Sequence, residues 1–113
     1  SAAQKTGNGI VEAVDWQLTL HVSGPVSNQT AYVGLRAHFL VYREGGERPE
    51  ENIFRMEVTD IIEDTFSYLI MVRRAGTNAR CIRWELPKEE WRRIEAPVLS
   101  LYFPPEKLML MDS

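Results

Sequence analysis

The chain has only one cysteine, Cys81, and therefore cannot form an internal disulfide. A lone thiol is typical of a protein in a reducing compartment such as the cytoplasm. No run of about 18 apolar residues is present, so no segment has the sequence of a membrane-spanning helix. Basic residues are not in excess either, and the net charge of −3 argues against a nucleic-acid-binding domain.

Sequence motifs for catalysis and for metal binding are also missing. There is no Gly-x-x-x-x-Gly-Lys-Ser/Thr loop to hold a nucleotide phosphate, and no Cys-x-x-Cys or His-x-x-x-His spacing for a metal ion. His21, His38 and Cys81 are far apart in the sequence. We therefore expect no enzymatic activity, no metal site and no cofactor in this segment.

What is present is the composition of one folded domain. The 113 residues are 44% hydrophobic and 26% charged, which is enough for a modest core. Residues 1–9 lack the apolar centre of a signal peptide. Because they open with Ser-Ala-Ala, a candidate cloning remnant, we treat them as a flexible start and expect the folded domain over 10–113.

Alternating and β-branched segments predict strands over most of the chain. The clearest example is 17–22, where Leu18, Leu20 and Val22 share one face. One short helix is predicted at 87–94, because proline suits a first helical turn and acidic residues precede basic ones, as the helix dipole favours. The other predicted strands cover 10–14, 30–35, 52–62, 66–73, 79–86, 98–103 and 108–111.

A charged loop with glycine and proline at 43–51 divides the chain into two lobes, about 10–42 and 52–112. The lobes are similar in two places. "YVGLRAHFLV" and "SLYFPPEKLM" align at one constant offset, and "IVEAVDWQLTLHV" aligns with "EVTDIIEDTFSYLIMV". The paired residues are Val33 with Leu101, Leu35 with Phe103, Leu40 with Leu108, Val11 with Val58, and Val14 with Ile61. Two similar short-stranded lobes predict an all-β protein, either one small β-barrel or two packed half-barrels.

The repeat also bears on Arg36 and His38, which are separated by one residue. An arginine and a histidine at this spacing suggest a phosphate site or half of an active site. In the aligned second lobe, however, Pro104 and Glu106 take their places, and those residues offer no such chemistry. We therefore interpret Arg36 and His38 as a turn at the end of a strand.

Two clusters of functional side chains have a structural explanation as well. Arginines are dense between residues 73 and 93 and can bind an oxyanion, since guanidinium groups match its oxygens. Glutamates in the same region can instead neutralise them, and we favour this: Arg73, Arg74, Arg80, Arg83, Arg92 and Arg93 face Glu85, Glu89, Glu90 and Glu95. For Trp16, Trp84 and Trp91 we favour a place in the core over a stacking surface.

Three segments resemble, in order, the C-terminal accessory region of the ATP-binding subunits of ABC importers. "YVGLRAHFL" carries an apolar-Gly-apolar-Arg phrase at the end of a strand. "ENIFRMEV" is similar to the Asn-led strand that opens the next segment, and "LSLYFPPEKLMLMD" looks like the terminal strand, turn and strand. That region is the TOBE (transport-associated OB) domain. The resemblance covers nearly the whole chain from about Asn8.

The resemblance implies an OB-like β-barrel with a regulatory and dimer-contact role, in a molybdate-type, sulfate-type or related system. The ATP and Mg²⁺ of such a subunit are held by a nucleotide-binding domain that precedes this region. That domain also contacts the membrane permease subunits. The implied location is cytoplasmic, peripheral to the inner face of the cell membrane, in a homodimer of ATPase subunits.

An alternative function follows from related molybdate-binding modules. In these modules a Ser-Ala-Arg-Asn signature opens a strand, and a lysine follows the asparagine by three residues. Asn52 matches the asparagine, and Arg55 keeps a cation at the lysine position. Pro49, Glu50 and Glu51 replace the other three residues, and a carboxylate there repels an anion. The resemblance thus implies, as the alternative, an oxyanion sensor with Asn52 and Arg55 as candidate ligands.

Overall fold

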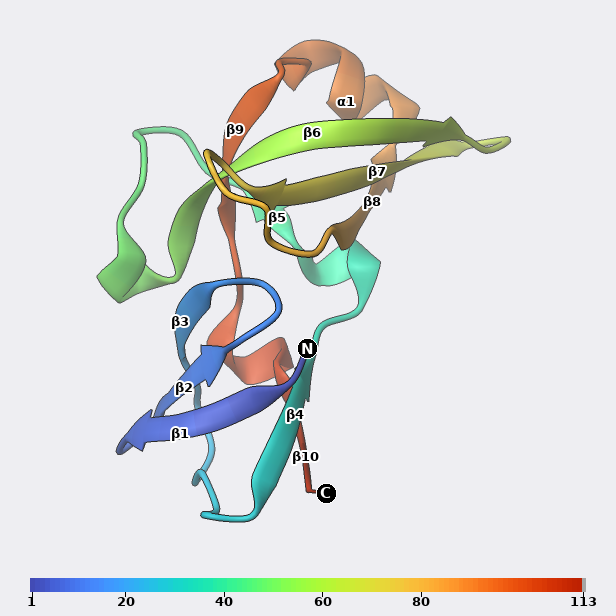
Figure 1. The fold of residues 1–113 in the computed structure, drawn as a ribbon. Coiled ribbons are helices and arrows are strands. Elements are labelled where there is room, and N and C mark those ends of the chain that lie inside the picture. Colours follow the sequence, from blue (N-terminus) through green and yellow to red (C-terminus); the bar gives the residue numbers. More distant parts are fainter. Residues whose placement is uncertain (113) are drawn as a thin grey trace.

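The computed structural model describes residues 1–112, and all of its paired strands are antiparallel (Figure 1). The strands are β1 (Ala3–Gly7), β2 (Ile10–Ala13), β3 (Leu18–His21), β4 (Thr30–Gly34), β5 (Val41–Tyr42), β6 (Ile53–Glu63), β7 (Ser67–Arg74), β8 (Ile82–Pro87), β9 (Val98–Tyr102) and β10 (Met109–Asp112). The helical elements are the 3₁₀ turns η1 (Ala37–Phe39), η2 (Pro49–Glu51) and η3 (Pro105–Lys107), and the helix α1 (Lys88–Ile94).

The strands form two lobes with the same strand order. In the first lobe β10 pairs with β4, an isolated bridge between Ala2 and Tyr32 connects β4 to the start of β1, and β1, β2 and β3 form a sheet. The second lobe is a single sheet in the order β5-β9-β6-β7-β8. The fold is therefore all-β and OB-like, with two similar lobes and a short helix at α1, as predicted.

Each lobe gives one strand to the other. The two segments that carry the chain between the lobes, which we call crossings, are matched. After β4 of the first lobe the chain passes through η1 into β5, which pairs with β9 of the second lobe. After β9 it passes through η3 into β10, which pairs with β4 of the first lobe. The same offset that aligns Val33 with Leu101 also relates β4 to β9 and η1 to η3. This half of the predicted repeat is confirmed.

The crossings change two details of the sequence interpretation. Strand β5 falls inside the predicted first lobe, 10–42, but pairs in the second, and β10 falls inside 52–112 but pairs in the first. The common strand order also makes β1 the equivalent of β6, and β2 the equivalent of β7. The predicted alignment of Val11 with Val58, which matches β2 to β6, is therefore wrong by one strand, because short apolar patterns agree by chance.

Strand β1 lies within residues 1–9 and contradicts the predicted flexible start. Only Ala3 of this strand is buried, so the segment has no apolar alternation. Backbone hydrogen bonds hold it on both sides: the N–H of Val14 donates to the carbonyl of Ala2 (2.8 Å), and the N–H of Val33 donates to that of Ser1 (2.9 Å). This segment completes the first lobe through its backbone.

Buried side chains from both lobes form one core. The ring of Phe103, beside the second crossing, lies 5.8 Å from Phe54 and 6.3 Å from Trp16, measured between ring centroids. Trp84 and Trp91 meet edge to face at 5.9 Å and hold α1 against β8. No tryptophan is more than 9% exposed, which confirms that these side chains belong to the core. Among the described residues, no helix is long and apolar enough to cross a membrane.

Candidate functional site

Asn52, the first candidate oxyanion ligand, is fully buried. It follows η2 in the left-handed conformation (φ 58°), which asparagine adopts more readily than most residues. Its Oδ1 accepts a hydrogen bond from the N–H of His21 (2.8 Å), and its Nδ2 donates to the carbonyls of His21 (2.7 Å) and Phe103 (3.0 Å). Because both amide hydrogens are engaged, Asn52 has no donor left for an anion in this structure.

The side chain of Asn52 instead fastens the lobes together. Its two bonds to His21 are those that a neighbouring strand would make, so the amide caps the free edge of β3. The third bond reaches Phe103, the residue that follows β9. One buried amide therefore links the first lobe to the second crossing.

Arg55, the second candidate ligand, has a fixed backbone and a free side chain. Its N–H donates to Oε1 of Glu47 (3.2 Å), and its carbonyl accepts from the N–H of Ala75 (2.9 Å). Within residues 1–112 its exposed guanidinium makes no hydrogen bond and has no carboxylate at ion-pair distance. A free guanidinium remains available for an anion.

Arg55 lines a hollow of about 230 Å³ that lies between the start of the 43–51 loop and β9. Arg43 and Ser100 line the same hollow, together with one carboxylate, Glu44. The guanidinium of Arg43 also donates from Nη1 to the carbonyl of Tyr42 (3.3 Å) and lies 5.0 Å from the ring centroid of Tyr102, at the border with the second hollow. The two arginines still outweigh the single carboxylate, so the net charge of the lining favours a negatively charged occupant. Its volume is several times that of a water molecule, which occupies about 30 Å³ in the liquid, and a tetrahedral oxyanion fits.

Asn52 lies beside a different hollow, of about 560 Å³, which Arg43 also lines. The charges there are balanced, since Glu50 and Glu51 face Arg43 and Arg48, and the Nε of Arg48 lies 3.5 Å from Glu51. The structure therefore does not bring the two candidate ligands into one hollow. It adds Arg43, which no sequence motif marks, because the first crossing carries that residue next to β9.

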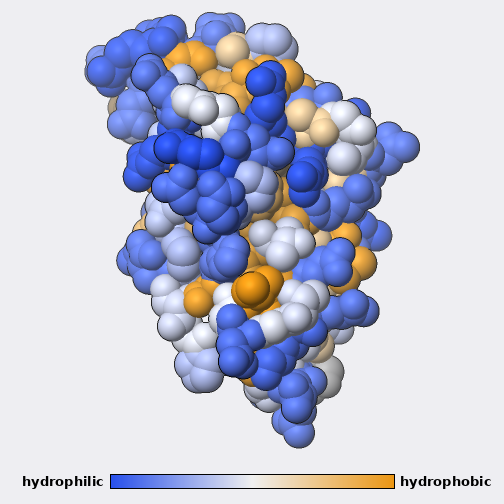
Figure 2. Space-filling view, turned by 90° about the vertical axis from the view of Figure 1, so that its left-hand side faces the viewer, coloured by the Kyte–Doolittle hydropathy of each residue, from blue (hydrophilic) through white to orange (hydrophobic). Residues whose placement is uncertain are grey.

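Both hollows adjoin the 43–51 loop, which lies on the left of Figure 1. That side faces the viewer in Figure 2, where hydrophilic residues dominate and apolar residues reach the surface only between them. A polar, well-hydrated face suits an inorganic anion better than an apolar ligand.

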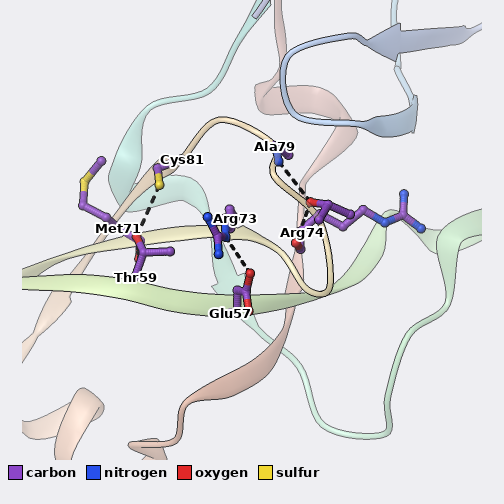
Figure 3. A network of polar contacts seen from close by, with 8 residues as sticks. Glu57, Thr59, Met71, Arg73, Arg74, Ala79 and Cys81 are labelled. Carbon is purple, nitrogen blue, oxygen red and sulfur yellow. Dashed lines mark hydrogen bonds and ion pairs between the residues drawn. The ribbon is translucent and has the colours of Figure 1, made fainter.

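Two of the clustered arginines are neutralised, although not by the predicted glutamates. Arg73 pairs with Glu57 across β6 and β7 (Figure 3). Arg74 donates from Nη1 to the carbonyl of Gln17 (2.7 Å), and its Nη2 lies 3.8 Å from Glu47. Within residues 1–112 no ion pair involves the predicted partners Glu85, Glu89, Glu90 and Glu95.

The remaining candidates do not assemble into a site. Arg36 and His38 are exposed at η1, directly after β4, which confirms the turn at the end of a strand. The sulfur of Cys81 lies 3.2 Å from the hydroxyl of Thr59 on the outer face of the second sheet (Figure 3). Across residues 1–112 no group of three or more His, Cys, Asp or Glu side chains is placed to hold a metal ion.

Two antiparallel half-barrels that exchange a strand through matched crossings define an OB-like, TOBE-like fold. The chain is similar over its whole length to a crystal structure of ModG, described as a cytoplasmic molybdate-binding protein, with molybdate bound. The TM-score is 0.72 and the identity 13%, with 100% of this chain and 91% of that chain covered. At this identity the likeness establishes the fold.

No protein-family model matches the sequence, and no curated protein matches it either.

Proposed function

We propose that this domain binds a tetrahedral oxyanion of the molybdate class and has no catalytic activity or cofactor of its own. The observation that carries the proposal is the free guanidinium of Arg55, which shares a positively charged hollow with Arg43 and Ser100. The likeness to a protein whose structure contains molybdate supports the choice of ligand. In this proposal Arg55 and Arg43 bind the anion, Ser100 donates a hydrogen bond, and Asn52 holds the lobes in place.

Isothermal titration calorimetry with molybdate, tungstate and sulfate tests this proposal. We expect saturable binding that Arg55→Gln and Arg43→Gln each weaken about 10- to 100-fold, because each removes a charged hydrogen bond worth about 1.5–3 kcal/mol. Arg83→Gln is the matched control, since it removes the same charge from an exposed position on β8. Absence of heat at millimolar ligand, or an equal loss in the control, contradicts the proposal.

A second candidate function is an accessory domain of an ABC importer's ATP-binding subunit. It is favoured by the position of the resembling segments, since "YVGLRAHFL" and "LSLYFPPEKLMLMD" contain the two crossings that define the fold. In that case the domain contacts its counterpart in a cytoplasmic homodimer of ATPase subunits at the membrane permease. ATP and Mg²⁺ belong to the nucleotide-binding domain.

The reading frame upstream of Ser1 tests this second function directly. A phosphate-binding glycine loop, Gly-x-x-x-x-Gly-Lys-Ser/Thr, is expected there if the domain belongs to an ATPase subunit. A frame without such a loop contradicts the ABC assignment and leaves the oxyanion proposal intact.

A further inference from the structure

A second concave surface, which we call the β8 groove, lies between α1 and the crossing segment 38–42. It consists of two hollows, of about 520 and 620 Å³, that share four lining residues: His38, Glu85, Leu86 and Pro87. Strand β8 and the tip of the β6–β7 hairpin lie together on the right of Figure 1. Each hollow alone has the size of a small-molecule site, and joined they form a longer groove.

The walls of the β8 groove are largely apolar. Its floor is made by Leu40, Trp84 and Leu86, which are buried in the core, and its accessible apolar surface comes from the half-buried Val41, Tyr42 and Ile94 and the exposed Pro87. At the far end Phe66 stands at the tip of the β6–β7 hairpin with 86% of its surface exposed. An apolar groove next to a fully exposed aromatic ring is a typical feature of a protein-binding surface.

The charges around the groove are mainly negative. Asp64, Glu85 and Glu90 line it, and none of them forms an ion pair within residues 1–112. The lining residues also include Arg93, whose Nε donates to the carbonyl of Glu89 (3.4 Å), and His38, whose ring centroid lies 4.2 Å from that of Phe39 in a tilted arrangement. Three unpaired carboxylates against one arginine attract a positively charged partner.

We propose that the β8 groove binds a basic amphipathic segment of a partner protein. The apolar side chains of that segment lie on Tyr42, Pro87 and Ile94, and its lysines or arginines face Glu85, Glu90 and Asp64. Binding of an amphipathic helix along an apolar groove is a common mode of peptide recognition. This interaction is independent of the oxyanion hollow at Arg55.

The charges argue against two other occupants. In a symmetric dimer the same patch lies on both copies, so Glu85 and Glu90 of one copy would approach the same carboxylates of the other. An oxyanion is repelled by the same groups. A basic partner relieves this repulsion, and the length of the joined hollows favours a segment over a small organic cation.

Fluorescence anisotropy with labelled synthetic peptides tests the proposal on the full chain. The probe is a peptide of about 14 residues, four helical turns, with leucine on one face and lysine on the other. A matched peptide replaces every lysine with glutamate. We expect the leucine–lysine peptide to bind saturably at physiological salt and the leucine–glutamate peptide not to bind.

Variants then locate the binding surface. The double substitution Glu85→Gln and Glu90→Gln is expected to weaken binding about two- to thirtyfold, since exposed ion pairs contribute about 0.2–1 kcal/mol each. The control, Glu12→Gln with Glu106→Gln, removes the same charge from exposed positions outside the groove and should leave binding unchanged. Phe66→Ser should also weaken binding, and because Phe66 is exposed it should not unfold the protein.

Several results overturn the proposal. An equal loss in the control pair shows attraction to net charge alone, and equal binding of both peptides shows an apolar contact without charge selection. Binding of benzyltrimethylammonium in the absence of peptide binding identifies a small-cation site instead. A dimer by sedimentation equilibrium that Phe66→Ser converts to monomer identifies a second copy as the occupant.

Discussion

The side-chain amide of Asn52 pairs with the backbone of His21 in two hydrogen bonds, as if it were a residue of a neighbouring strand. Its remaining hydrogen reaches the carbonyl of Phe103, so one buried side chain connects β3 to the second crossing. This arrangement explains why an asparagine opens β6. An acceptor and two donors are needed at a single left-handed position.

Replacing Asn52 with alanine should therefore destabilise the fold. We expect a loss of about 3 kcal/mol in the free energy of unfolding, because backbone groups of His21 and Phe103 remain buried without partners. Urea unfolding followed by tryptophan fluorescence measures it. The control Asn28→Ala, in an exposed turn, should change stability by less than about 0.5 kcal/mol. A loss of oxyanion affinity without a loss of stability contradicts this structural role.

The matched crossings predict that Arg36 tolerates proline. Arg36 has φ −69° and ψ 139°, close to the −60° and 120° of the equivalent Pro104, and its N–H makes no backbone hydrogen bond within residues 1–112. Arg36→Pro should raise stability by about 0.4–1 kcal/mol through a less flexible unfolded chain. Arg43→Pro removes an N–H bonded to the carbonyl of Ser100 (3.0 Å) and should cost about 1–3 kcal/mol. Thermal unfolding of the two variants compares them, and equal losses contradict the equivalence.

Arg74 is expected to hold the lobes together through its guanidinium group. It donates to Gln17 in the first lobe (2.7 Å), and its guanidinium carbon lies 5.4 Å from the ring centroid of Phe54. Arg74→Lys keeps the charge but loses this planar geometry, so we expect a loss of about 1–2 kcal/mol. Arg83→Lys, on the edge strand β8, is the control and should be neutral. Urea midpoints that are equal for both variants argue against this role.

Asp15 is expected to make the first lobe sensitive to acid. The hydrogen bond from the N–H of Ala2 (2.8 Å) lowers the pKa of the Asp15 carboxyl below its ordinary value of 3.8, with further help from Arg80 and Ser1 that outweighs desolvation. Since the pKa is lower in the folded state, the stabilisation is present above about pH 4 and is lost as the pH falls through the folded value.

The comparison with Asp15→Asn isolates this contribution. The wild-type protein should have the higher urea midpoint near neutral pH, and the difference should shrink as the pH falls below about 4. A difference that stays constant across this range shows that the Asp15 charge does not stabilise the contact with Ala2.

Much of the local structure was predictable from the sequence. Alternating apolar residues mark β3, proline and charge order mark α1, and the constant offset between Val33 and Leu101 anticipates the matched crossings. These features depend on neighbouring residues, whose pattern the sequence displays directly. Strand β1 was missed because backbone hydrogen bonds hold it, and such bonds leave no side-chain pattern.

The candidate site was likewise predictable from the sequence only in part. The sequence alone determined that Asn52 and Arg55 open the second lobe, that cations are available there, and that the protein is built from two similar β-lobes. Only the tertiary structure decided that the Asn52 amide is engaged by His21 and Phe103, and that Arg55 shares its hollow with Arg43. These contacts join residues brought together by strand exchange between the lobes, and distance along the chain does not reveal which long-range partners a buried polar group will find.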